Sequence, residues 1–207
     1  NSLILKGLSE CRLTVPASVP NLVLTGATDV SVTGTDGVTC LVTSEGNTIA
    51  PCPKLQEFHW EGTTFSAAVV PTSDLSRLSA LSVTADAVDP NLCIPTGLTS
   101  LEMNVKDASF DLARVPTTLV EFAFAPKSDC SFAPFTDLTR LGVWMTTPVR
   151  LTFPTQLKRL DVIEGSLGES NIADVALETF SSIVNPLTLA ELERLPKTLE
   201  QIEAELE

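Results

Sequence analysis

Three polar residues alternate with aromatic ones between positions 57 and 61, and their side chains are of types that bind metals or move protons. They are Glu57, His59 and Glu61, and His59 is the single histidine of the chain. A metal or acid–base centre needs more converging groups than one imidazole and two carboxylates. Cys40 leaves a Cys40–His59 pair as an alternative, but the spacing does not place the two side chains at hydrogen-bond distance. We therefore expect a solvated polar face here, with no catalytic centre, metal or cofactor.

The cysteines give no sign of a metal-binding motif. There are five of them, widely spaced, at positions 11, 40, 52, 93 and 130. No C-x-x-C pair occurs, so a structural zinc site is not expected. An odd number of distant cysteines is typical of free, mostly buried thiols in a reducing compartment. Together with the absence of an N-x-[ST] motif, this favours an intracellular location, in the cytoplasm or on the cytoskeleton, with an extracellular surface as the alternative.

Charge and composition exclude several kinds of partner. The chain has 207 residues, of which 26 are acidic and 13 are basic, and its formal net charge is −13. Nucleic acids and anionic membranes are bound through Lys and Arg, so neither is an expected partner, whereas a basic protein is permitted. A hydrophobic content of 43% is enough for a sizeable core. No apolar run approaches the roughly 18 residues that cross a membrane, so no membrane insertion is expected.

A repeated string is the main feature of the sequence. An apolar residue, two variable residues, an apolar residue, one variable residue and usually a third apolar residue recur along the chain. Clear copies carry an upstream proline, as in Pro95-Thr-Gly-Leu98-Thr-Ser-Leu101-Glu-Met103 and Pro154-Thr-Gln-Leu157-Lys-Arg-Leu160-Asp-Val162. The middle apolar position falls at Leu3, Leu22, Leu41, Phe58, Leu81, Leu101, Phe122, Leu141, Leu160, Phe180 and Ile202. These positions are 17 to 23 residues apart, and from Leu22 onward the residue three before each is Leu or Val. The agreement in register, more than any single copy, predicts a repeat structure.

This pattern resembles the leucine-rich-repeat family, whose repeats have about 20–29 residues and the string L-x-x-L-x-L. With its prolines it is similar to a short subclass written L-P-x-x-L-x-x-L-x-V, found in bacterial effectors and some protozoan proteins. One feature differs, because the family usually has Asn or Cys three residues after the last apolar position of the strand. This chain has Thr63, Asp86, Lys106, Lys127, Thr146 and Gly165 there. The turn after each strand must therefore satisfy its backbone in another way.

The resemblance implies an α/β-type solenoid, that is, a right-handed coil with one curved parallel β-sheet and a mostly irregular or 3₁₀ convex side. It implies a single domain over residues 1–207 with about ten repeats, and we interpret the chain as a fragment of a longer protein. Coils this short leave about ten residues for the return, which favours extended or 3₁₀ segments over full helices. The longer coils near 71–77 and 172–178 have room for a helical turn, with Asp74 and Asn171 as expected caps.

The resemblance also implies that partners bind the concave face of the sheet, to which the variable strand positions point. Trp144 and Ile163 fall at the same position of adjacent strands, beside small residues at 123, 125 and 142 and next to Arg140 and Arg159. An aromatic residue and arginines around a hollow are typical of a protein-binding hot spot. Alternatively, Trp144 folds back and fills the edge of the core. The expected binding residues are Trp144, Ile163, Arg140, Arg159, Glu121, Glu102 and His59. Of these, Glu121, Arg140 and Arg159 are expected to form a charge ladder across neighbouring strands.

We therefore expect a protein-interaction scaffold that binds a protein or peptide on its concave sheet and is not an enzyme by itself. One alternative is the recognition arm of a pathogen surface or effector protein. Another is a structural module that self-associates in a cytoskeletal assembly. The sequence identifies neither the partner nor the oligomeric state.

Overall fold

The computed structural model describes residues 1–207 except 73, 107–110, 146–148, 166–169, 185 and 205–207. Two compact units divide the chain. Unit 1 comprises Asn1–Leu98 and Val105–Val115, and unit 2 comprises Thr99–Asn104 and Pro116–Glu207. Each unit is built mainly from parallel strands with few helices, which confirms the predicted parallel sheet. The assignment of residues 1–207 to a single domain stays a prediction.

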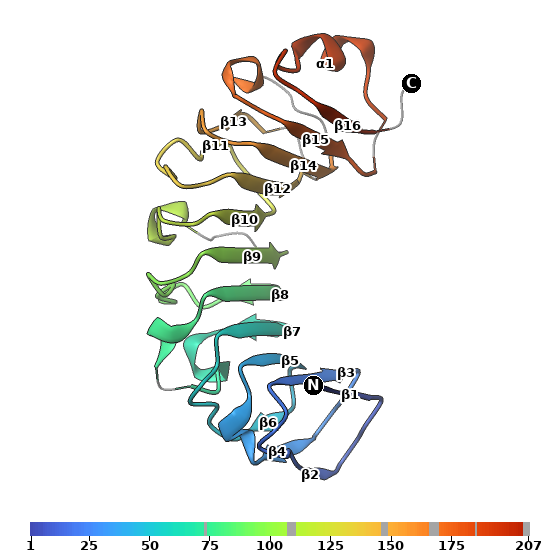
Figure 1. Ribbon diagram of the computed structural model, residues 1–207, viewed down its shortest axis with the longest axis vertical. Coiled ribbons are helices and arrows are strands. Elements are labelled where there is room, and N and C mark those ends of the chain that lie inside the picture. Colours follow the sequence, from blue (N-terminus) through green and yellow to red (C-terminus); the bar gives the residue numbers. More distant parts are fainter. Residues whose placement is uncertain (73, 107–110, 146–148, 166–169, 185, 205–207) are drawn as a thin grey trace. The chain divides into compact units, whose positions relative to one another are not determined.

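Unit 1 has a main sheet of parallel strands that follow one another in chain order (Figure 1). The strands are β1 (Ser2–Lys6), β3 (Asn21–Thr25), β5 (Cys40–Ser44), β7 (Glu57–Phe65) and β8 (Ala80–Val88). Their register pairs Leu3 with Leu22, Leu22 with Leu41, Leu41 with Phe58 and Phe58 with Leu81. These pairs are the ones that the repeated string predicts for this part of the chain.

The returning segments of unit 1 are extended or form single 3₁₀ turns. A second parallel sheet contains β2 (Arg12–Thr14), β4 (Ser31–Thr33) and β6 (Thr48–Ile49). The 3₁₀ turns are Thr35–Gly37, Ala67–Val69, Leu75–Arg77 and Leu112–Arg114. The return path therefore has the mixture of extended and 3₁₀ segments that the short coil length predicts.

Unit 2 repeats this arrangement with its own main strands. They are β9 (Ser100–Val105), β10 (Glu121–Phe124), β12 (Arg140–Trp144), β14 (Arg159–Glu164), β15 (Thr179–Ser182) and β16 (Gln201–Glu203). All neighbouring pairs are parallel, and Leu101, Phe122, Leu141, Leu160, Phe180 and Ile202 are in register. The returns hold β11 (Cys130–Ser131), β13 (Leu151–Thr152), a 3₁₀ turn at Ile172–Asp174 and the helix α1 (Leu189–Arg194).

The upstream prolines mark a turn that directs the chain into each strand. The backbone N–H three residues after the proline donates to the proline carbonyl, and the leucine that carries this N–H is the first apolar residue of the string. The N···O distances are 3.3 Å for Leu98 to Pro95, 3.4 Å for Leu119 to Pro116 and 3.2 Å for Leu157 to Pro154. All three leucines are 0% exposed. The P-x-x-L string is therefore a β-turn that delivers a leucine to the core.

Alternation along each strand separates an inward from an outward face. In β12, for example, Leu141 and Val143 are 0% exposed, while their neighbours are exposed or half-buried. This is the period of two that a sheet with one covered face requires. At the weak copies the polar residues Thr43 and Ser182 at inward positions are also buried, but in β15 the outward residue Ser181 is buried as well.

The turns and helix differ from the prediction in detail. The 3₁₀ turns at 75–77 and 172–174 are present, but neither Asp74 nor Asn171 caps its turn through the side chain. The Asn171 amide instead accepts from the Phe153 N–H (2.7 Å) and donates to the Phe153 carbonyl (3.1 Å). The side chain therefore satisfies the backbone of the neighbouring coil and not its own turn. Helix α1 was not predicted. It begins with a capping box in which Thr188 and Glu191 satisfy each other's backbone N–H groups.

Two of the turn positions that lack Asn or Cys, Thr63 and Lys106, are satisfied by other contacts. The Glu45 carboxylate accepts from the Thr63 backbone N–H at 2.6 Å and from its hydroxyl at 2.8 Å. The backbone N–H of Lys106 donates to the carbonyl of Ala85, and its ammonium group lies 2.7 Å from the Asp86 carboxylate. Thr146 lies outside the described residues.

Candidate functional site

The outward face of unit 2 contains an open hollow of about 260 Å³ over strands β9 to β14. It is lined by Ser100, Leu101, Glu102, Glu121, Phe122, Ala123, Arg140, Leu141, Gly142, Trp144, Asp161 and Ile163. Most of these residues occupy outward strand positions, because neighbouring parallel strands in register bring every second side chain to the same face. Five of the seven residues predicted for a binding surface line this hollow: Trp144, Ile163, Arg140, Glu121 and Glu102. Arg159 is not among the lining residues, and His59 belongs to unit 1.

Trp144 and Ile163 both line the hollow, but not at equivalent strand positions. The register of β12 and β14 shifts between Val143 and Trp144, so Trp144 pairs with Glu164 and not with Ile163. The prediction of equal positions was therefore wrong by one residue, because a bulge inserts an extra residue on one strand. Trp144 is half-buried, which leaves part of its ring at the surface.

Small residues form the floor of the hollow. Gly142 and Ala123 are direct neighbours in the register of β10 and β12. A Cβ atom on Gly142 would lie 3.2 Å from the Cβ of Ala123, which is closer than ordinary packing. Ala125, in contrast, is only 6% exposed and does not line the hollow. The hollow exists because two adjacent outward positions lack bulk.

The charged residues around the hollow form local ion pairs. Arg140 Nη1 lies 2.7 Å from Glu121 Oε1 across the two strands, as the predicted ladder requires. Arg159 does not extend the ladder: its Nε lies 2.9 Å from Asp161 Oδ2, two residues along the same strand. Residues two apart on a strand share a face, which brings the Asp161 carboxylate within reach of Arg159. Both pairs are solvent-accessible and contribute little to stability.

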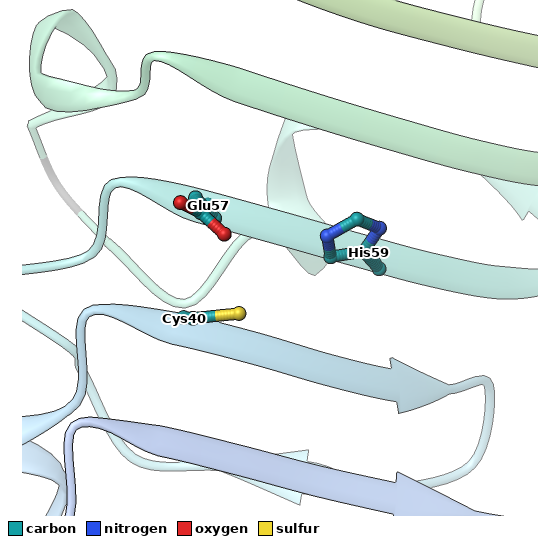
Figure 2. Close-up of side chains that lie close together, drawn as sticks. All are labelled: Cys40, Glu57 and His59. Carbon is teal, nitrogen blue, oxygen red and sulfur yellow. The ribbon is translucent and has the colours of Figure 1, made fainter. Parts of the chain in front are cut away.

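Unit 1 brings together a cysteine, a glutamate and the histidine on its outward face (Figure 2). The ligand atoms of Cys40, Glu57 and His59 all lie within 4.8 Å of one another. Cys40 and Glu57 are register partners on β5 and β7, and His59 is two residues beyond Glu57. The sequence prediction treated 57–61 as a solvated polar face and kept a Cys40–His59 pair only as an alternative, without Glu57. The repeat register itself carries the missing signal, because Cys40 and Glu57 both precede the middle apolar residue.

The Cys40 thiol is held in its protonated form. Burial raises the pKa of Cys40 to about 11, with further contributions from the charge of Glu57 and from a hydrogen bond to its carboxylate. A protonated thiol is a poor nucleophile. Cys/His nucleophilic catalysis is therefore not favoured at this cluster. Glu61 lies apart from the three residues and lines a second hollow, of about 170 Å³, together with His59.

All five cysteines have free thiols. Only Cys52 is buried, while Cys93 is exposed and the others are half-buried, so the prediction of mostly buried thiols was wrong. Burial, reinforced by the charge of Asp129, raises the pKa of the Cys130 thiol to about 11.

Cys130 is expected to react with iodoacetamide more slowly than Cys93. A thiol with a pKa near 11 is about one part in a thousand thiolate at pH 8, and its thiolate fraction rises about tenfold per pH unit up to that pKa. Peptide mass spectrometry after timed alkylation at pH 8, 9 and 10 measures the rate at each cysteine, with the exposed Cys93 as the internal reference. Equal rates at Cys130 and Cys93 would show that burial and Asp129 do not suppress the thiolate.

Among the described residues, no helix is long and apolar enough to cross a membrane. Comparisons of the chain with protein-family models, with curated proteins and with solved structures found no match.

Proposed function

We propose that this chain is a divergent leucine-rich-repeat coil and that it binds a peptide or protein loop in the hollow of unit 2. The observation that carries the proposal is the combination of a half-buried Trp144 with Ile163 around an open hollow whose floor is made of Gly142 and Ala123. Partly exposed tryptophan beside aliphatic surface is enriched where proteins bind one another. The repeated string and its strand register support the family assignment.

The hollow suits an apolar anchor residue of the partner. Its volume of about 260 Å³ accommodates one or two side chains but not a folded domain. Trp144 and Ile163 provide apolar contact, and burying them would remove surface from water at about 25 cal/mol per Å². A protruding loop or an extended peptide therefore fits this surface better than a flat protein face.

The charges favour a basic residue next to that anchor. Three carboxylates lie in or beside the hollow, at Glu102, Glu121 and Asp161, against the guanidinium groups of Arg140 and Arg159. The chain as a whole carries a net charge of −13. Such a field attracts basic partners and raises their association rate. We infer that the partner segment combines an apolar anchor with Lys or Arg.

Trp144→Ala is expected to weaken binding of such a peptide by about 2 kcal/mol or more, which is about thirtyfold in Kd. Random peptides displayed on phage are selected against the immobilised chain, and the enriched peptides are synthesised and titrated by calorimetry. Enrichment of an apolar residue adjacent to Lys or Arg is the expected sequence pattern.

Ile183→Ala is the matched control, because Ile183 is a 63% exposed apolar residue of unit 2 that does not line the hollow. This variant should bind the selected peptides as the original chain does. If both variants lose the same affinity, or if neither loses any, the peptides bind elsewhere and the assignment of the hollow is wrong.

A further inference from the structure

The cluster on β5 and β7 has the composition and spacing of a metal site. Cys40, Glu57 and His59 offer a sulfur, a carboxylate oxygen and an imidazole nitrogen, all within 4.8 Å of one another (Figure 2). The three side chains come from two neighbouring strands, and the parallel register of these strands fixes the relative positions of their Cα atoms. Strands are about 4.8 Å apart, and residues two apart on one strand share a face. The backbone thus holds all three ligands on one side of the sheet.

This set of ligands selects zinc over the hard cations. Calcium and magnesium prefer oxygen ligands, whereas a thiolate with an imidazole suits Zn²⁺. Zinc binds sulfur at about 2.3 Å and nitrogen or oxygen at about 2.0–2.2 Å, so its donor atoms lie roughly 3.3–3.6 Å apart. The ligand atoms of Cys40, Glu57 and His59, which lie within 4.8 Å of one another, must approach by at most roughly 1.5 Å to reach that spacing.

The surroundings leave the fourth coordination position open. Cys40 and His59 are half-buried and Glu57 is exposed, so the three ligands form the base of a surface site. The second hollow of unit 1, about 170 Å³ in volume, is lined by His59 and reaches the same outward face. Three protein ligands with an open fourth position is the arrangement that zinc uses when it also binds water or an external ligand.

We propose that Cys40, Glu57 and His59 bind one Zn²⁺ ion, whose fourth ligand is water or a donor group of a binding partner. On binding, the metal–sulfur bond replaces the S–H bond of Cys40, and the proton passes to solvent. The site belongs to unit 1 and does not depend on the peptide-binding hollow of unit 2.

The proposal is tested by titrating the full chain with cobalt and zinc. The buffer contains a reductant that keeps the cysteines reduced and does not itself bind metals. With Co²⁺ we expect one equivalent to produce a near-ultraviolet thiolate-to-cobalt absorption band, which added Zn²⁺ then abolishes. Cys40→Ser should remove the band, and Cys93→Ser should leave it unchanged, because Cys93 is an exposed thiol of the same unit outside the cluster.

His59→Gln and Glu57→Gln should each weaken zinc binding by at least about tenfold, since losing even an outer-shell partner of a metal costs about 10–100-fold. Circular dichroism of each variant establishes that the sheet is retained. Binding of zinc without a thiolate band would indicate adventitious binding to the acidic surface and would overturn the proposal. An unchanged affinity in Cys40→Ser would do the same.

Discussion

Replacing Phe122 by alanine is expected to lower the free energy of unfolding of the protein by about 3–5 kcal/mol. Phe122 lies in β10, is 2% exposed and contacts three other rings. Its ring centroid is 5.7 Å from that of Phe124, 6.0 Å from that of Phe132 and 5.9 Å from that of Phe135. Removing this ring leaves a cavity lined by three large aromatic side chains. Urea unfolding followed by far-ultraviolet circular dichroism measures the loss.

Val120→Ala is the control for this prediction, because Val120 immediately precedes the same strand and is 38% exposed. A truncation at an exposed position typically changes the stability by no more than about 0.5 kcal/mol. Phe122→Leu should fall between the two, since it keeps most of the apolar volume. If Phe122→Ala and Val120→Ala cost the same, the aromatic cluster does not hold unit 2 together and the assigned register loses its energetic basis.

The strand register was predictable because it is fixed by the core. Only one alignment of neighbouring strands places Leu141 beside Leu160 and keeps the alternate residues of both strands on the outward face. A slip by one residue would turn every apolar side chain to solvent. The same constraint holds in unit 1, where Leu41 pairs with Phe58. Local sequence and packing agree at these positions, so the pattern of apolar residues was sufficient.

The outward face was harder to predict, because burial does not constrain it. The register shift at Trp144 changes which residue of β14 lies opposite, and no apolar column reports it. Arg159 pairs with Asp161 on its own strand, and the choice of this partner over a cross-strand one depends on side-chain rotamers. The hollow could be anticipated from Gly142 and Ala123, but its exact lining could not.

Two local features were visible in the sequence and were overridden by the repeat template. The Thr188-Leu-Ala-Glu191 string is a capping-box signature, and it begins α1 where the repeat length favoured an irregular return. Cys40 and Glu57 occupy the same repeat position in consecutive coils, so their contact follows from the register alone. In the first case the local cap signal had to outweigh the repeat template, and in the second the side-chain chemistry had to be combined with a register that was already known.

The returning segments show a second constraint that the apolar pattern does not contain. Gly34 follows β4 and has a φ of +73°, and a Cβ atom there would lie 2.6 Å from the Val15 carbonyl oxygen of the preceding coil. The Val15 N–H in turn donates to the Thr33 carbonyl at 2.9 Å, which holds the two coils together at this point. Close approach of the backbones therefore requires glycine at position 34.

Gly34→Ala is expected to destabilise the protein by about 2–5 kcal/mol, the sum of about 1–2 kcal/mol for a left-handed backbone and about 1–3 kcal/mol for the steric overlap. Gly26→Ala separates the two causes, because Gly26 also has a positive φ, of +59°, but no atom lies within 4 Å of its hypothetical Cβ. It should lose only the first part. Urea unfolding of both variants measures the difference. Equal losses would mean that the coils of unit 1 separate enough to admit a methyl group, so that the strands and not the returns set their spacing.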